Sequence, residues 1–313
     1  SASSTSRPPT FTPFIPPSQP ASTVEGSSAV TGVMTQPLWQ FATGMTPSVY
    51  GVPGILSGAA LVFFAFIGFD VVATASEETK NPHKNVPLGI GVGMLLIIVM
   101  YMLVAVVTTG MVSYADLAKQ DSPSLATAFE LVGADWAAKI ISFGIVLGLA
   151  TVVMVLLLGL TRIVFAMSRD GLLPRGLSKT GKHGTPAALQ IVVGAVVALV
   201  AAFFDIGVLS DMVNIGTLSA FTLVAISIPI MRKKRPDLPR AFKMPGSPWI
   251  PILIAVANFW LMLNLSVLTW IRFVVWLVVG FAIYFGYGYW HARLGKGDLT
   301  ETLSAETDKA VNG

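Results

Sequence analysis

The sequence predicts an all-α membrane protein with seven transmembrane helices, and three observations carry this prediction. Of the 313 residues, 54% are hydrophobic and only 12% are charged, whereas a soluble domain has about 25% charged residues. The mean hydropathy is +0.73. Seven apolar runs have about the length, or more, of the roughly 20 residues that a helix needs to cross hydrocarbon. The predicted spans are Val52–Ser76, Val86–Val112, Trp136–Met167, Ala187–Phe204, Val208–Met231, Trp249–Leu268 and Ile271–Trp290.

The segments outside the spans are polar or short. Residues 1–51 are rich in Ser, Thr and Pro, with a short helix expected near Gln36–Thr43. Within this segment, Trp39 and Phe41 suit a membrane surface, where aromatic rings settle. Between the second and third spans, Ser122–Gly133 predicts a short helix that starts at Ser122-Pro123 and is too short to span.

The distribution of basic residues predicts the orientation. Of the 20 lysines and arginines, only Arg7, Lys119, Lys139 and Arg272 lie on one side of the predicted spans. Basic residues accumulate in cytoplasmic loops. We therefore expect residues 1–51 to be extracellular, and residues 232–248 to form a basic cytoplasmic loop. Residues 291–313 are then a cytoplasmic tail.

An interruption in the first span is the candidate functional feature. The run Phe63–Asp70 places a glycine and a carboxylate two-thirds of the way along an apolar stretch. Gly68 tolerates the backbone angles that a helix break requires, and Asp70 is a strong N-cap for a second half-helix. Carbonyl groups exposed at such a break accept hydrogen bonds from a cation or an ammonium group. The alternative is a continuous helix with Gly68 at a close contact, and the residues alone leave both open.

Charged residues at the ends of the first and third spans suggest an inner gate. Glu77 and Glu78 follow the first span, while Arg162 and Arg169 share one face of the third because they are seven residues apart. The alternative is that these charges are solvated at the interface, where ion pairs are individually weak.

Polar residues in the fifth span suggest a polar bundle interior, since polar groups in spans usually face inward. The residues concerned are Asp211, Asn214, Thr217 and Ser219. The alternative for them is interhelical hydrogen bonding.

Several classes of function find no support in the sequence. Cysteine is absent, so no disulfide or thiolate chemistry is expected. The histidines His83, His183 and His291 are scattered, which argues against a metal site. The run Gly176–His183 fails as a phosphate-binding loop because His183 stands where that motif needs Ser or Thr. We expect no enzyme activity, no cofactor and no nucleic-acid partner.

Four stretches resemble the amino acid–polyamine–organocation transporter superfamily, and most closely its cationic amino acid transporter branch. FFAFIGFDVVATASEETKNPHKNVPLGI (63–90) resembles the sixth membrane helix and the loop after it. TRIVFAMSRDGLLP (161–174) resembles the segment after the eighth helix, and DMVNIGTLSAF (211–221) resembles the tenth helix. RKKRPDLPRAFKMPGSPWIP (232–251) resembles the next cytoplasmic loop.

This resemblance implies an amino acid permease of the LeuT type, with two inverted five-helix repeats followed by two further helices. Residues 52–231 correspond to the second repeat and residues 249–290 to the last two helices. The first repeat is absent, which implies a fragment whose partners include those missing helices. The implied substrate is an amino acid, moved across the plasma membrane by alternating access with protons. The implied pocket wall consists of Phe64, Ala65, Phe66, Ile67, Gly68 and Phe69, with Asp70 as cap.

Two alternative functions belong to other classes of protein. A regulatory or scaffolding membrane fragment needs no solute pocket. A seven-helix receptor or retinal protein matches the topology, but Ile271–Trp290 lacks the lysine that retinal needs and the chain lacks cysteine.

Overall fold

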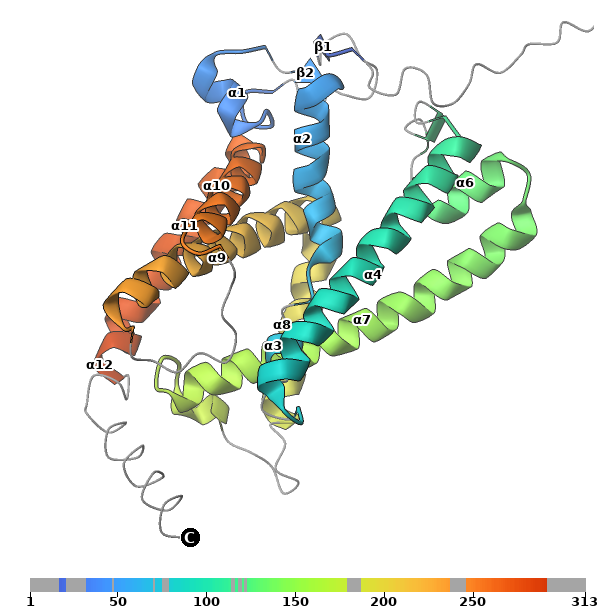
Figure 1. The fold of residues 1–313 in the computed structure, drawn as a ribbon. Coiled ribbons are helices and arrows are strands. Elements are labelled where there is room, and N and C mark those ends of the chain that lie inside the picture. The colour runs from blue at the N-terminus through green and yellow to red at the C-terminus, as the bar shows by residue number, and fades with distance from the viewer. Residues whose placement is uncertain are drawn as a thin grey trace, which may run out of the picture. The chain divides into compact units, whose positions relative to one another are not determined.

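The computed structural model describes residues 17–20, 32–46, 48–69, 71–74, 79–113, 116–117, 120, 123–178, 187–236 and 246–291. This part of the chain is almost entirely helical (Figure 1). The main helices are α1 (Leu38–Thr43), α2 (Gly51–Val62), α3 (Val71–Thr74), α4 (Pro82–Met111), α6 (Leu125–Leu131), α7 (Asp135–Arg169), α8 (Ala187–Phe203), α9 (Ile206–Lys234), α10 (Trp249–Leu263) and α11 (Val267–Ile283). The minor elements are η3 (Phe63–Phe66), η5 (Arg175–Ser178), η6 (Tyr284–Gly288), α12 (Tyr289–His291) and the strands β1 (Gln19–Pro20) and β2 (Ser48–Val49), which pair antiparallel.

The chain divides into two compact units. The first comprises residues 1–151 and 209–270, and the second residues 152–208 and 271–313. The first unit therefore holds α2, α4, α6, α10 and most of α9. The second unit holds α8 together with the C-terminal part of α7 and most of α11.

Four helices of the described chain are long and apolar enough to cross a membrane. They cover Lys84–Met111, Asp135–Arg169, Ile206–Lys234 and Val267–His291. Three further apolar helices are shorter and cover Gly51–Phe66, Ala187–Phe203 and Trp249–Leu263. Each of the seven corresponds to one predicted span, but at about 1.5 Å per residue the three short helices fall below the hydrocarbon thickness. Their crossing of the membrane remains a prediction.

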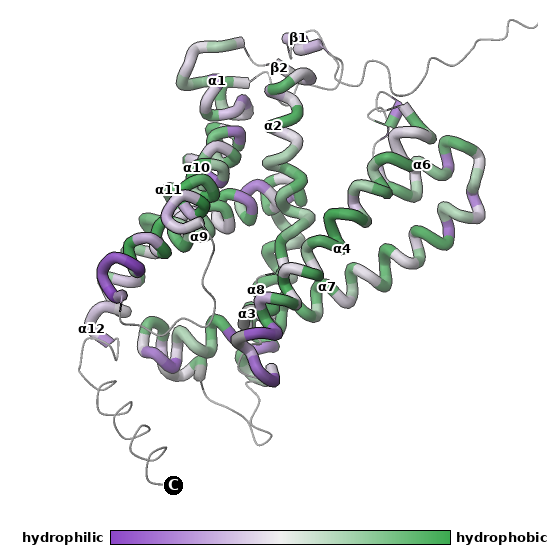
Figure 2. The backbone as a smooth tube through the Cα atoms, viewed as in Figure 1, coloured by the Kyte–Doolittle hydropathy of each residue, from purple (hydrophilic) through white to green (hydrophobic). Residues whose placement is uncertain are grey.

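Helix α4 is apolar on all sides. Its central residues Leu95, Leu96 and Met102 are exposed, and the side of α4 seen in Figure 2 is coloured largely as hydrophobic. A helix that is hydrophobic all round belongs in a protein core or in a membrane. Because the rest of the described chain leaves these side chains uncovered, α4 has the surface of a membrane span.

The segment before α2 is held against the turn between α10 and α11. Leu38 N donates to Leu265 O (3.0 Å), Val267 N to Gln36 O (3.1 Å) and Leu268 N to Met34 O (2.8 Å). The Trp39 ring stacks on Trp260, with 6.5 Å between ring centroids, and its Nε1 donates to Asn264 Oδ1 (3.0 Å). We call this set of contacts the outer clamp. The short helix predicted at Gln36–Thr43 is present as α1, but Trp39 packs on protein, because Asn264 offers its indole N–H a partner.

The turn between the last two predicted spans lies earlier than expected. Helix α10 ends at Leu263 and α11 begins at Val267, so the predicted end at Leu268 was wrong. Polar side chains explain the difference. Asn264 Nδ2 donates to Trp260 O (2.8 Å), and Ser266 Oγ accepts from Thr269 N (3.2 Å) as an N-cap does. Beyond the turn, Trp270 Nε1 donates to Met262 O (3.0 Å) and its ring meets Phe259 edge to face.

Helix α6 also begins later than predicted. Its first residue is Leu125, and its N-cap is Ser124, whose Oγ accepts a hydrogen bond from Thr127 N (3.1 Å). Ser124 has the extended backbone that an N-cap residue needs. The prediction that Ser122-Pro123 starts this helix was therefore wrong.

Candidate functional site at the interrupted helix

The predicted break in the first apolar helix is present. Helix α2 ends at Val62, and η3 continues as a tighter 3₁₀ turn to Phe66. Ile67 is then extended (φ −66°, ψ 136°), and Gly68 has φ +123°. A four-residue helix, α3, follows from Val71 (Figure 1). The alternative of a continuous helix is excluded.

Gly68 allows this backbone path because it has no Cβ. A residue with a side chain rarely adopts φ +123°, whereas glycine populates positive φ at little cost. Apart from its chain neighbours, no atom of the described residues lies within 4 Å of the place that a Cβ would occupy at Gly68. Glycine is therefore needed here for its conformation, and space for a side chain is available.

The break leaves some carbonyl groups without hydrogen bonds. Phe64 O accepts from Ile67 N (3.2 Å), and Gly68 O accepts from Val71 N (3.2 Å). Within the described part of the chain, no hydrogen bond reaches the carbonyl oxygens of Phe66 and Ile67. These two groups are the acceptors that the break offers to a ligand, as carbonyls do at interrupted helices.

The carbonyl of Ala65, which belongs to the predicted pocket wall, has a partner. Tyr101 Oη, on α4, donates to Ala65 O at 2.9 Å. The Tyr101 ring also meets Phe66 edge to face, with 5.1 Å between centroids and 68° between planes. Sequence reasoning missed Tyr101 because no local pattern links residues that are 36 positions apart.

The aromatic side chains around the break have different surroundings. Phe63 and Phe69 both contact Phe221 on α9, at 6.2 Å and 5.5 Å between ring centroids. Phe66 contacts Tyr101, whereas Phe64 has no ring contact with the described residues and is 42% exposed. Phe64 is thus the aromatic side chain at the break that is least restrained by packing.

The structure describes the two arginines of the predicted inner gate but not its acidic residues or the predicted cap. Asp70, Glu77 and Glu78 lie outside the described residues. Arg162 and Arg169 both lie on α7, and Arg169 Nε is 3.5 Å from Asp170 Oδ1, with both side chains more than half exposed. An exposed ion pair of this kind contributes about 0–1 kcal/mol.

The polar residues of α9 differ in their hydrogen-bond partners. Thr269 Oγ1 on α11 donates to Asp211 Oδ2 (3.0 Å), which is an interhelical hydrogen bond. Ser219 Oγ instead donates to Gly216 O (2.7 Å) in its own helix, so interhelical bonding was wrong for this residue. Asn214 is 0% exposed, and neither Oδ1 nor Nδ2 has a partner among the described residues, while Thr217 is half-buried.

The buried carboxamide of Asn214 carries a prediction about stability. A buried polar group without a partner costs about 1–3 kcal/mol, so we expect Asn214→Leu to stabilise the protein by about 1 kcal/mol. Asn264→Leu is the matched control, because buried Asn264 makes both of its hydrogen bonds, to Trp39 and Trp260. That change should destabilise the protein. Thermal unfolding of the purified variants measures both, and a lower unfolding temperature for Asn214→Leu would contradict the prediction.

In the described part of the chain, no three His, Asp or Glu side chains come close enough to hold a metal ion. The described residues of the break offer neutral carbonyl acceptors and aromatic rings. Such a site suits a ligand with N–H donors and an apolar part.

Comparison with known proteins places the chain among transporters. The model of the family "Amino acid permease" matches residues 12–289. A branched-chain amino acid permease of Bacillus subtilis (strain 168) is 47% identical over 79% of this chain and 53% of its own length. A methylthioribose transporter of the same organism is 43% identical over the same shares. Cationic amino acid transporter 3, mitochondrial, of Arabidopsis thaliana is 45% identical over 62% of this chain and 31% of its own length.

The chain therefore spans about half the length of the bacterial relatives and a smaller part of the plant one. The family match covers most of the chain and includes the interrupted helix. Together with the apolar helices it identifies a multi-pass membrane protein. The resemblance seen in the sequence motifs is confirmed: the chain belongs to the amino acid permease family and is a cationic amino acid transporter-like member of the amino acid–polyamine–organocation superfamily.

Proposed function

We propose that this protein is a secondary active permease that carries amino acids across the plasma membrane. The observation that carries the proposal is the break between Val62 and Val71, with two carbonyl groups unpaired among the described residues, in a chain of the amino acid permease family. Unpaired backbone groups at membrane depth are tolerated where they line a cavity or bind a ligand. A transport cycle of alternating access uses such a break without any covalent step.

The proposed site assigns a role to each residue around the break. The carbonyl oxygens of Phe66 and Ile67 accept hydrogen bonds from the α-ammonium group of the substrate. Phe64, the least restrained ring, closes over the substrate, and Phe69 forms a wall against Phe221. Asp70 caps the following half-helix, as its residue type favours.

The proposed inner gate consists of Glu77 and Glu78 with Arg162 and Arg169. In the outward-open state, ion pairs between these groups would close the cytoplasmic end. Asn214 and Thr217 contribute polar groups to the interior of the bundle, and the complete burial of Asn214 supports this role.

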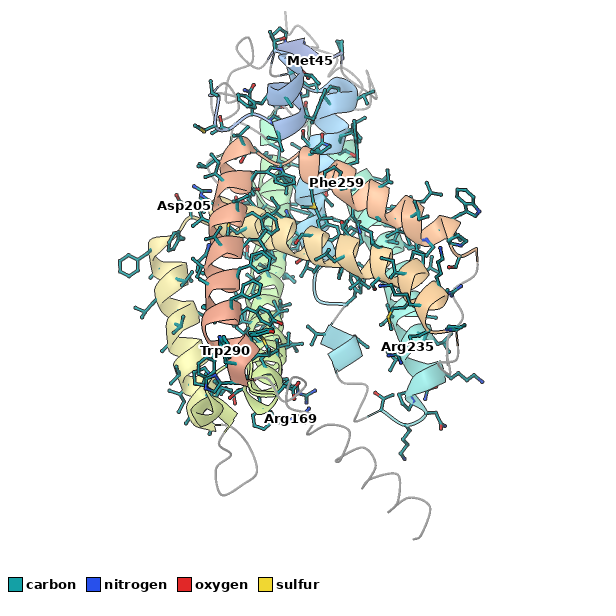
Figure 3. The ribbon with its side chains drawn as sticks, turned by 90° about the vertical axis from the view of Figure 1, so that its left-hand side faces the viewer. Met45, Arg169, Asp205, Arg235, Phe259 and Trp290 are labelled. Carbon is teal, nitrogen blue, oxygen red and sulfur yellow. The ribbon has the colours of Figure 1, made fainter. Side chains whose placement is uncertain are left out.

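The proposed topology has seven transmembrane helices, five in residues 52–231 and two in residues 249–290. Residues 1–51 are extracellular and residues 291–313 cytoplasmic, with residues 232–248 as a basic cytoplasmic loop. Arg232, Lys233 and Lys234 in the last turn of α9 support this orientation, since basic residues gather at cytoplasmic ends. Figure 3 labels Arg235 just beyond that end of α9.

Uptake into proteoliposomes tests the proposed function. We expect saturable uptake of radiolabelled L-leucine or L-arginine that an inward proton gradient stimulates several-fold and a protonophore removes. Unlabelled methylthioribose serves as a competitor, because one relative is a transporter of that compound. Saturable binding of methylthioribose with no binding of either amino acid would overturn the assignment of substrate. Uptake that is the same with and without a proton gradient would overturn the proposed coupling to protons.

A further inference from the structure

One residue outside the predicted site makes two contacts with the break. Tyr101, in the middle of α4, donates its hydroxyl hydrogen to Ala65 O at 2.9 Å. The same ring meets Phe66 edge to face at 5.1 Å. The residue is 42% exposed, so it is held at the break by these contacts and not by burial in a core. Both contacts fall on the last two residues of η3, directly before the extended Ile67.

These contacts restrain the backbone at the point where η3 ends. Ile67 N bonds back to Phe64 O (3.2 Å) and Val71 N bonds back to Gly68 O (3.2 Å), and the extended Ile67 and the positive φ of Gly68 lie between these two turns. A hydrogen bond to the Ala65 carbonyl fixes the orientation of the peptide group between Ala65 and Phe66. The ring contact adds about 0.5–1.5 kcal/mol and orients Phe66 itself. A phenol hydroxyl in apolar surroundings also needs a partner, which makes the hydrogen bond persistent.

We propose that Tyr101 is a positioning residue that gives this site its preference for a primary ammonium group. By occupying the Ala65 carbonyl and holding Phe66, Tyr101 keeps the unpaired Phe66 and Ile67 carbonyls in one orientation. A primary ammonium has three N–H donors and satisfies both carbonyls, whereas a tertiary ammonium has one donor and leaves a carbonyl unpaired. This inference rests on the proposed function, because it concerns the ligand of the same break.

Removing only the hydroxyl group tests the proposal. Tyr101→Phe keeps the ring and its contact with Phe66 but loses the hydrogen bond to Ala65. Tyr284→Phe is the matched control, since Tyr284 is 43% exposed and its hydroxyl has no hydrogen bond to the described residues. The ligands are L-leucine or L-arginine, whichever the protein takes up, and the N,N-dimethyl derivative of that amino acid.

We expect Tyr101→Phe to weaken binding of the amino acid about three- to tenfold, as for loss of one hydrogen bond. Binding of the dimethyl derivative should change less, so the ratio of the two dissociation constants falls. A purely structural role would weaken both ligands equally. An unchanged ratio, or an equal change in Tyr284→Phe, would overturn the proposal.

Hydrogen–deuterium exchange gives a second measurement that needs no ligand. In Tyr101→Phe, the amides of residues 63–72 should exchange about three- to tenfold faster, while the rest of α4 remains as in the wild type. Unchanged exchange in residues 63–72 would overturn the positioning role even if no amino acid binds. If the wild type shows no uptake but Tyr101→Phe exchanges faster, the proposed function and the ammonium preference are overturned. Only the positioning of the backbone by Tyr101 then remains.

Discussion

Replacing Gly68 with valine is expected to reduce amino acid binding by roughly 10- to 100-fold. Gly68 has φ +123°, and a β-branched residue there is strained by about 1–3 kcal/mol or more. The chain relieves this strain by leaving the observed backbone path. Phe66 and Ile67 are the two residues directly before Gly68. When the backbone at Gly68 changes its path, the orientation of their carbonyl groups is lost. Each 1.4 kcal/mol by which the substitution disfavours the binding-competent conformation weakens the apparent affinity about tenfold.

The matched control for this change is Gly58→Val. Gly58 lies within α2 with ordinary helical backbone angles, and, as at Gly68, no atom lies within 4 Å of a Cβ placed there. The two substitutions thus add the same side chain to open space and differ in backbone angle. We expect Gly58→Val to bind as the wild type does. Binding of labelled amino acid to purified protein measures both variants, and equal affinity in the two would contradict the assignment of the break as the site.

Replacing Trp39 with alanine is expected to destabilise the first unit by about 3 kcal/mol. The change removes the stacking on Trp260 and the hydrogen bond to Asn264 Oδ1. Asn264 is buried, so its amide oxygen would be left without this partner. The loss also weakens the outer clamp, because the three backbone hydrogen bonds of residues 34–38 lie beside this tryptophan. Thermal unfolding in detergent, followed by circular dichroism, measures the effect.

Phe41→Ala is the control for the outer clamp. Phe41 lies on the same short helix, is exposed and makes no ring contact with the described residues. We expect it to change stability by no more than about 0.5 kcal/mol. Hydrogen exchange localises the effect, since the amides of Val267 and Leu268 donate to the clamp. Trp39→Ala should speed their exchange, and equal stability of the two alanine variants would show that the clamp contributes nothing.

The two predictions concern opposite ends of one helix. Residues 34–40 hold the chain just before α2, while Tyr101 and Phe221 contact the chain just after it. Helix α2 itself packs against α10, whose C-terminal turn carries the outer clamp. The break is therefore placed by contacts on both sides of α2, which explains how the irregular residues 67–69 keep their backbone path.

The location of the break was predictable from local chemistry. A continuous apolar helix gains nothing from Gly68 and the nearby carboxylate of Asp70. Glycine is also the residue that tolerates positive φ. The apolar helices were predictable for the same reason, since hydropathy acts residue by residue over about 20 positions. Family membership followed from motifs such as residues 63–90, which the family match includes. Helix ends were less predictable, because Ser122 and Ser124 are equally good caps by residue type and only the fold selects Ser124.

The sequence by itself thus determined an all-helical membrane protein of the amino acid permease family, and it marked Phe63–Asp70 as the place where the first apolar span could be interrupted. Only the tertiary structure decided that the helix is broken there and which carbonyls of the break have no partner among the described residues. Tyr101 takes the Ala65 carbonyl, and so leaves Phe66 and Ile67 as acceptors. It also decided that Trp39 packs on Trp260 and that Asn214 is buried without a partner among the described residues. The physical reason is that apolar periodicity and glycine conformation are local properties, whereas a hydrogen bond between distant residues exists only once packing brings them together.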